Sequence, residues 1–144
     1  MLTTPVIHPQ ILEALARSGH FAQVMIADGN LPVGAMKGPN ASIVYLNFQP
    51  GLLSTVQVLK GVLSVCPIQG ATVMQKPAEA DASIHEEYRE LLGPVEWNEL
   101  ERWAFYDKIR EPSTTLVIAT GEQRRFANLL LTVGVVKMAS ESNF

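Results

Sequence analysis

Two polar residues near the start of the chain flank one short apolar run, and their side chains could do acid–base chemistry. His20 carries an imidazole, the side chain that most often takes up and releases protons in catalysis. Asp28, which follows the run, carries a carboxylate that can accept hydrogen bonds or orient a histidine ring. Such a pair suits general acid–base catalysis if both residues belong to one site.

The residues between His20 and Asp28 predict a buried strand that ends at a turn. Residues 24–27 form a short apolar run, and residues 28–32 (Asp-Gly-Asn-Leu-Pro) have the composition of a turn. In open α/β sheets, ligands bind outside the carboxyl ends of strands, which is where Asp28 would lie. A strand of about five residues spans roughly 16 Å at about 3.3 Å per residue. The two residues therefore share a pocket only if His20 folds back from its loop, or if adjacent subunits bring different copies together.

Helices and strands are predicted to alternate along the chain. Apolar residues at helical spacing, with their start and stop signals, predict helices at residues 9–17, 52–62, 83–92 and 97–107. Short apolar or β-branched runs predict strands at residues 24–27, 42–46, 71–74 and 115–120, and extended segments at residues 129–132 and 135–137. This alternation favours an α/β sheet covered on both faces, in a single domain over residues 1–144.

Local signals mark the ends of these elements. Gly19 suits the left-handed position that ends many helices, so we expect it to end the first one. Ser83 and Glu86 have the spacing of a capping box and should begin the third helix. Residues 31–40 are rich in glycine and proline and predict a long loop, and such loops in compact domains are often functional.

The composition excludes several classes of protein. Apolar residues make up 47% of the 144 positions and charged residues 17%, so the chain can bury a core and is not expected to be disordered. A net charge of −3 argues against a nucleic-acid partner, because phosphate binding needs a basic surface. The single cysteine, Cys66, excludes an internal disulfide and a cysteine-rich metal site. Neither a signal peptide nor a membrane-spanning apolar stretch is apparent, so the expected location is the cytoplasm, with no membrane partner.

Several motifs that would name a reaction are missing from the sequence. No glycine-rich phosphate loop follows a predicted strand, and no Gly-x-Ser-x-Gly elbow is present. The three histidines are dispersed, so we expect no protein-held transition metal. Residue chemistry alone therefore leads to an α/β domain with a cluster of polar loops, and not to a reaction.

Four blocks of the sequence together resemble the D-ribose pyranase / L-fucose mutarotase family. They are Ser-Gly-His at residues 18–20, Asp-Gly-Asn-Leu-Pro at 28–32, Arg-Trp-Ala-Phe-Tyr at 102–106, and Thr-Gly-Glu, Phe-Ala-Asn and Gly-Val within 120–135. The order and spacing match over essentially the whole chain, and the third block is closer to the fucose branch. One block alone would be weak, but the four together are specific.

The resemblance implies a fold, an activity and an assembly. Members of the family interconvert the cyclic forms of free monosaccharides, and fucose-branch enzymes exchange the two anomers. They use no metal and no cofactor. The resemblance thus implies an isomerase with a three-layer α/β/α sandwich and a mostly parallel or mixed sheet. It also implies self-association into a ring-like homo-oligomer, such as a decamer, with sites at subunit contacts.

Residue by residue, the resemblance assigns roles to the polar blocks. The family's catalytic histidine falls on His20, and its sugar-binding aspartate falls on Asp28. Arg102 falls on the polar position of the fucose-type aromatic block, where the alternative is a solvated helix face. Tyr106, in the same block, is a sugar contact or a core aromatic with a paired hydroxyl.

The last block departs from the family pattern. The family's Tyr-(Ala/Gly)-Asn block falls on Phe126, Ala127 and Asn128, so a phenylalanine stands where the family has tyrosine. This replacement removes a hydroxyl from a site where sugar hydroxyls are recognised. Residues 29–30 also differ, with Gly-Asn where Ala-His or Ala-Gly is usual. Glu122 is open between a supporting role in the site and a plain loop carboxylate.

The implied chemistry is the opening and re-closing of a hemiacetal ring. We hypothesise that His20 exchanges protons with the sugar, that Asp28 accepts from sugar hydroxyls, and that Arg102 and Asn128 donate to sugar oxygens. Two alternatives stay open at this point. One is a ribose-type pyranase, and the other is a non-catalytic sugar-binding protein that has kept the pocket.

Overall fold

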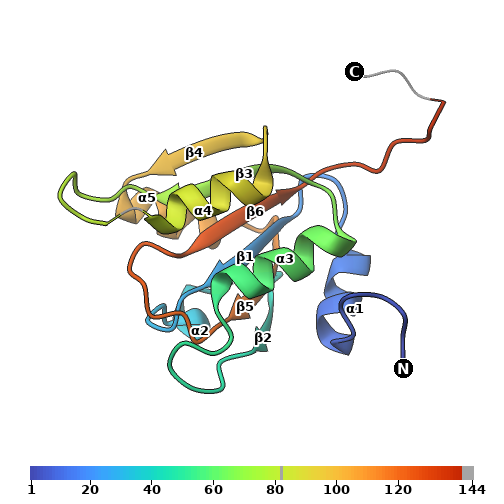
Figure 1. Ribbon diagram of the computed structural model, residues 1–144, viewed down its shortest axis with the longest axis horizontal. Helices are drawn as coiled ribbons and strands as arrows, with labels where there is room; N and C mark the ends of the chain where they lie inside the picture. The colour runs from blue at the N-terminus through green and yellow to red at the C-terminus, as the bar shows by residue number, and fades with distance from the viewer. Residues whose placement is uncertain (82, 141–144) are drawn as a thin grey trace.

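A six-stranded mixed sheet forms the centre of the computed structural model, which describes residues 1–81 and 83–140 (Figure 1). The strand order is β2-β5-β1-β6-β3-β4. The strands are β1 (Gln23–Ala27), β2 (Ser42–Tyr45), β3 (Ile68–Met74), β4 (Glu96–Leu100), β5 (Thr114–Ala119) and β6 (Leu129–Val133). The β1–β5, β2–β5 and β3–β4 pairs are parallel, whereas β6 runs antiparallel to both β1 and β3.

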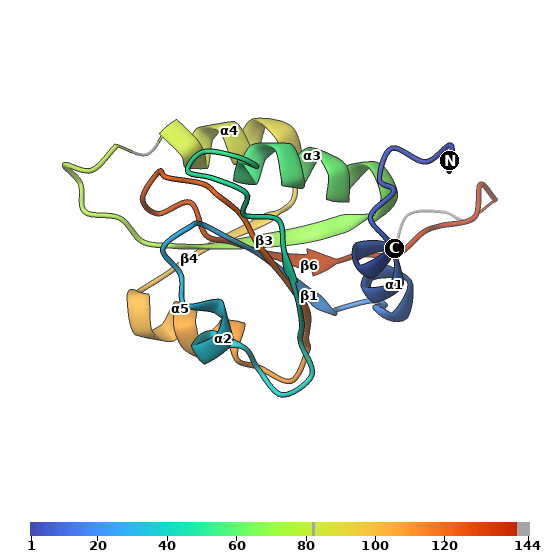
Figure 2. The same ribbon diagram turned by 90° about the horizontal axis from the view of Figure 1, so that it is seen from below.

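Helices lie on both faces of this sheet (Figure 2). They are α1 (Pro9–Arg17), α2 (Val33–Met36), α3 (Thr55–Val65), α4 (Ser83–Leu92) and α5 (Arg102–Ile109). Helices α3 and α4 cover one face, and α2 and α5 cover the other. The predicted three-layer α/β/α sandwich with a mixed sheet is confirmed.

The central strand β1 shows why two layers of helices are needed. Its five residues are all buried, as expected for a strand covered on both faces. Val24 and Ile26 pack into the core beneath α1, α3 and α4, while Met25 and Ala27 pack into the core beneath α2 and α5. Side chains alternate between the faces of a strand, so one continuous apolar run supplies both cores.

The helix ends differ from two predictions. Gly19 does not take a left-handed conformation; helix α1 ends at Ser18 in an extended conformation, and Phe21 has the positive φ, +72°. Ser83 does not cap α4 from outside but is its first residue, and the Asp81 carboxylate accepts from the Ser83 backbone N–H. A capping box is instead present at Ser54 and Gln57, where it begins α3.

The predicted helix over residues 97–107 is wrong in its first part. Glu96–Leu100 is the edge strand β4, paired in parallel with β3, and α5 begins only at Arg102. Trp97 and Leu100 pack against opposite cores, as residues an odd number of positions apart do in a strand. The Glu101 carboxylate accepts from the N–H groups of Trp103 and Ala104, which fixes the start of the helix.

Smaller differences concern the extent of the other elements. The predicted loop over residues 31–40 contains the one-turn helix α2, and residues 135–137 lie beyond the last strand. The helix predicted at residues 52–62 covers Thr55–Val65, and the strand predicted at 71–74 already begins at Ile68. The remaining predicted helices and strands occur within a residue or two of their expected ends.

Candidate functional site

One edge of the sheet gathers loops from four separate parts of the chain. Strands β1, β3 and β4 end there, and the antiparallel β6 begins there. These loops enclose a pocket of about 250 Å³. It is lined by Asp28, Asn30, Leu31, Pro32, Met74, Arg102, Tyr106, Arg125, Phe126 and Asn128.

A reciprocal pair, Asp28 and Asn128, forms the floor of this pocket. Both residues are only 6% exposed. The Asn128 side-chain oxygen accepts from the Asp28 N–H at 2.8 Å, and its amide nitrogen donates to Asp28 Oδ2 at 3.1 Å. The two bonds fix which end of the amide carries oxygen, so the orientation of Asn128 follows from Asp28.

The turn after β1 holds the other carboxylate oxygen of Asp28. Oδ1 accepts from the backbone N–H groups of Asn30 at 2.9 Å and Leu31 at 3.0 Å. Burial raises the pKa of the Asp28 carboxyl, and these donors offset part of that shift. The outcome is a fixed, buried acceptor at the carboxyl end of a central strand, as the position of Asp28 in the sequence predicts.

Two arginines reach the pocket from different loops. Arg102 is the first residue of α5, and the Arg125 guanidinium lies 5.3 Å from the centre of the Phe126 ring. Neither has a carboxylate partner among residues 1–81 and 83–140. The arginines that do have carboxylate partners are Arg17, Arg89, Arg110 and Arg124. Arg102 and Arg125 are thus donors that a ligand in the pocket could use.

Apart from Phe126, the apolar lining of the pocket was not predicted from the sequence. Leu31, Pro32, Met74 and Phe126 give it a partly apolar wall, and Arg125 was also missed. Tyr106 lines the pocket and packs its ring edge-to-face against Trp103, so it meets both the pocket and the core beneath α5. The glycine- and proline-rich composition of residues 28–32 was the one available signal, because it marked the loop that supplies Leu31 and Pro32.

Ala127, which is predicted to contact the sugar, does not line the pocket. Its side chain is fully buried in the core shared with α3 and α4. Its carbonyl accepts from the Tyr88 hydroxyl at 2.5 Å. The neighbouring Phe126 carbonyl accepts from His85 Nε2 at 2.8 Å. Side chains of helix α4 are therefore hydrogen-bonded to two successive peptide carbonyls, those of Phe126 and Ala127, next to the pocket.

The structure does not bring His20 into the pocket of its own chain. His20 precedes β1, so it lies at the opposite edge of the sheet from Asp28, and the five residues of β1 alone span about 16 Å. Its Nε2 lies 2.8 Å from the side-chain oxygen of Gln69 in β3, and its ring stacks on Phe21 at 3.8 Å. Folding back of His20 within one chain is thereby excluded in this structure.

The bond to Gln69 has a chemical consequence for His20. A side-chain carbonyl oxygen can only accept, so His20 Nε2 carries the hydrogen of that bond. In the neutral ring the lone pair is then on Nδ1. Gln69 thus selects a histidine tautomer whose Nδ1 can act as a base.

A second cavity adjoins the pocket on the side of β5. It measures about 370 Å³ and is lined by loop residues that follow β1, β2 and β5, with Asn30 shared between the two cavities. Within residues 1–81 and 83–140 there is no cluster of three or more His, Cys, Asp or Glu that could hold a metal ion. In the same residues no helix is long and apolar enough to cross a membrane.

The buried His85 makes a prediction for stability against pH. Burial lowers the pKa of His85 from its ordinary value of 6.5, and the bond to the Phe126 carbonyl offsets part of this. The unfolded chain then binds this proton more readily than the folded protein, so the free energy of unfolding falls as the pH drops below 6.5 and levels off below the lowered pKa.

Urea unfolding of the wild type and of His85→Gln between about pH 7.5 and about pH 5 measures this effect. Glutamine can still donate to the Phe126 carbonyl but does not titrate, so the variant should lose that part of the pH dependence. The same dependence of unfolding on pH in both proteins would contradict the assignment.

The comparisons with known proteins agree with this architecture. The model of the RbsD / FucU transport protein family matches residues 1–136. D-ribose pyranase 2 of Streptomyces griseus is 29% identical, covering 94% of this chain and 98% of its own, and human fucose mutarotase is 28% identical, covering 92% of each. The crystal structure of FucU from Bifidobacterium longum is 35% identical, with a TM-score of 0.78 over 91% of this chain and 97% of its own.

The fold and the match over nearly the whole chain define the class of protein. This chain belongs to the RbsD / FucU transport protein family. Its relatives include proteins named D-ribose pyranase and fucose mutarotase. The family predicted from the four sequence blocks is confirmed.

Proposed function

We propose that this protein is a mutarotase, an isomerase that interconverts the α- and β-anomers of a free monosaccharide such as L-fucose. The observation that supports this most is the buried Asp28–Asn128 pair on the floor of a monosaccharide-sized pocket with Arg102 beside it. Buried, oriented acceptors and donors are the groups that recognise sugar hydroxyls. The relatives named fucose mutarotase and D-ribose pyranase provide independent support.

The proposed mechanism is ring opening by general acid–base catalysis. His20 Nδ1 takes the proton of the anomeric hydroxyl, the bond between the anomeric carbon and the ring oxygen breaks, and the protonated His20 then delivers that proton to the ring oxygen. The free aldehyde then turns its other face to the returning oxygen, and the reverse proton transfers close the ring as the other anomer. Asp28 accepts from a sugar hydroxyl throughout, while Arg102 and Asn128 donate to sugar oxygens.

We propose that the site is completed by a neighbouring copy of the chain. In one chain His20 faces away from the pocket that contains Asp28, at the other edge of the sheet. His20 and Phe21 are exposed there, so both rings are available to another subunit. A ring-like homo-oligomer, such as a decamer, would bring the His20 of one subunit to the pocket of the next.

The apolar wall of the pocket supports a deoxy sugar as substrate. L-Fucose and L-galactose differ at one carbon, where fucose has a methyl group and galactose a hydroxymethyl group. A methyl group can pack against Leu31, Met74 or Phe126 without burying an unpaired hydroxyl. We expect kcat/KM for L-fucose to exceed that for L-galactose by about ten- to a hundredfold.

Saturation-transfer NMR between the anomer signals tests the activity directly. Exchange is measured for L-fucose, L-galactose and D-ribose, with and without the protein. Faster α/β exchange of L-fucose supports the proposal. Binding of the sugar without faster exchange favours a non-catalytic sugar-binding protein, the alternative suggested by Phe126 in place of the family's tyrosine. Faster pyranose–furanose exchange of D-ribose alone favours the ribose-type pyranase.

A further inference from the structure

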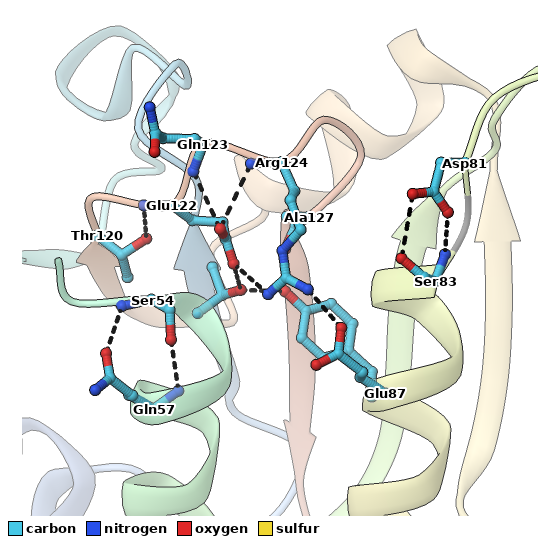
Figure 3. A network of polar contacts seen from close by, with 12 residues as sticks. Ser54, Gln57, Asp81, Ser83, Glu87, Thr120, Glu122, Gln123, Arg124 and Ala127 are labelled. Atoms are coloured by element: carbon cyan, nitrogen blue, oxygen red, sulfur yellow. Dashed lines mark hydrogen bonds and ion pairs between the residues drawn. The ribbon is translucent and has the colours of Figure 1, made fainter. Parts of the chain in front are cut away.

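Arg124 forms ion pairs with Glu122 and Glu87, next to the loop that supplies Phe126 and Asn128 to the pocket (Figure 3). The Arg124 guanidinium bridges two carboxylates, one from its own loop and one from helix α4. Its Nη2 donates to Glu122 Oε1 at 2.8 Å, and its Nη1 donates to Glu87 Oε2. The Glu122 side chain is only 6% exposed, whereas Arg124 and Glu87 are partly exposed.

The Glu122 carboxylate accepts hydrogen bonds from the loop residues that follow it and from helix α3. It accepts from the backbone N–H groups of Gln123 at 3.1 Å and Arg124 at 3.5 Å, and from the Thr55 hydroxyl of α3 at 2.9 Å. Burial by itself would raise the pKa of Glu122, but the hydrogen bonds from Arg124 and Thr55 outweigh it and hold the pKa below the ordinary value. The carboxylate is therefore ionised at neutral pH.

Helix α4 holds the loop at successive positions. Its Glu87 binds the Arg124 side chain, its His85 binds the Phe126 carbonyl, and Tyr88 binds the Ala127 carbonyl. Phe126 has a φ of +62°, in the left-handed region that side chains other than glycine rarely adopt. These contacts on both sides keep Phe126 in that conformation.

We propose that Arg124 is a positioning residue for the sugar site: by bridging Glu122 and Glu87, it fixes the loop 123–128 so that Phe126 and Asn128 meet the substrate. This role rests on the proposed function, since it acts through residues of the same pocket. Arg124 itself is absent from the pocket lining, whereas its neighbour Arg125 lines it. One of the two adjacent arginines therefore faces the ligand, and the other ties the loop to helix α4.

The test compares Arg124→Gln, Arg124→Lys and Glu87→Gln with the wild type. Arg110→Gln is the matched control, because Arg110 forms an exposed ion pair with Asp107 at the far end of α5 and is neither in the pocket lining nor next to His20. Two quantities are measured: amide hydrogen exchange of residues 121–128, and KM and kcat for L-fucose exchange. Urea unfolding reports whether each variant is folded.

Arg124→Gln should speed hydrogen exchange in residues 121–128 and raise KM by about ten- to a hundredfold, with a smaller change in kcat. Lysine keeps the charge but cannot bridge both carboxylates, so Arg124→Lys should lie between the wild type and Arg124→Gln. Glu87→Gln should shift both quantities in the same direction, and Arg110→Gln should shift neither. If Arg124→Gln does not fold, the same two quantities are compared between the wild type, Arg124→Lys and Glu87→Gln.

Two results would overturn the proposal. One is unchanged hydrogen exchange of residues 121–128 in the folded variants. The other is faster exchange of that loop with KM unchanged, which would make the ion pairs of Arg124 purely structural. If the wild type neither binds nor exchanges any sugar, the proposed function fails. The hydrogen exchange then still decides whether Arg124 fixes the loop.

Discussion

Replacing His20 by alanine is expected to slow α/β exchange by about 10²–10⁴-fold, because the variant has no group that can pass protons to and from the sugar. The affinity for the sugar should change little, since the pocket floor is built from other residues. The exposed His20 side chain hydrogen-bonds only to Gln69 and stacks on Phe21 among the described residues, so the free energy of unfolding should stay close to the wild type. Saturation-transfer NMR measures the rate, and sugar titration measures the affinity.

Gln69→Leu is the companion variant for His20. It keeps the imidazole but removes the acceptor that selects the tautomer with a basic Nδ1. We expect an intermediate loss of rate, with no loss of affinity. Full exchange activity in His20→Ala would show that another group moves the protons.

Replacing Asn128 by alanine is expected to have the second large effect. The buried N–H of Asp28 loses its acceptor, and Asp28 Oδ2 loses a donor. Leaving buried polar groups unpaired should lower the free energy of unfolding by about 1–3 kcal/mol. An Asp28 carboxylate that is no longer held in place should lower kcat/KM for the sugar by about a hundredfold.

Two further variants separate orientation from charge. Asn128→Asp keeps the shape but puts a second carboxylate against the buried Asp28, so it should inactivate the protein at neutral pH and recover partly as the pH falls. Asn98→Ala is the matched control, because Asn98 is exposed on the edge strand β4 and its side chain, among the described residues, hydrogen-bonds only to Glu96. Wild-type sugar affinity in Asn128→Ala, measured by titration, would contradict the role given to the pair.

The fold was predictable where one pattern pointed to one structure. The apolar run at residues 24–27 in β1 is too short for a helix, and the turn residues after it fix where it ends. The region of β4 was misassigned because Trp97 and Leu100 are three positions apart. This spacing suits one face of a helix, and it equally suits the two opposite faces of an edge strand. Pairing with β3 decided between the two.

The site was predictable only in part. The position of Asp28 after a strand placed it at a ligand-binding edge, but its pairing with Asn128 joins residues 100 positions apart. Strand order decides that contact, because β6 must run antiparallel beside β1 to bring Asn128 back to the same edge. Met74 and Arg125 line the pocket for the same reason, from loops that no local pattern connects.

Each site is expected to combine His20 of one subunit with the Asp28–Asn128 pair of another. Mixing His20→Ala and Asn128→Ala subunits, by refolding them together, tests it most directly. Each variant alone should be nearly inactive. After random mixing, about one quarter of the sites should contain both an intact His20 from one subunit and an intact Asn128 from the next. We expect exchange activity to return to about that fraction of the wild type. Mixed subunits that stay as inactive as the separate variants would contradict it.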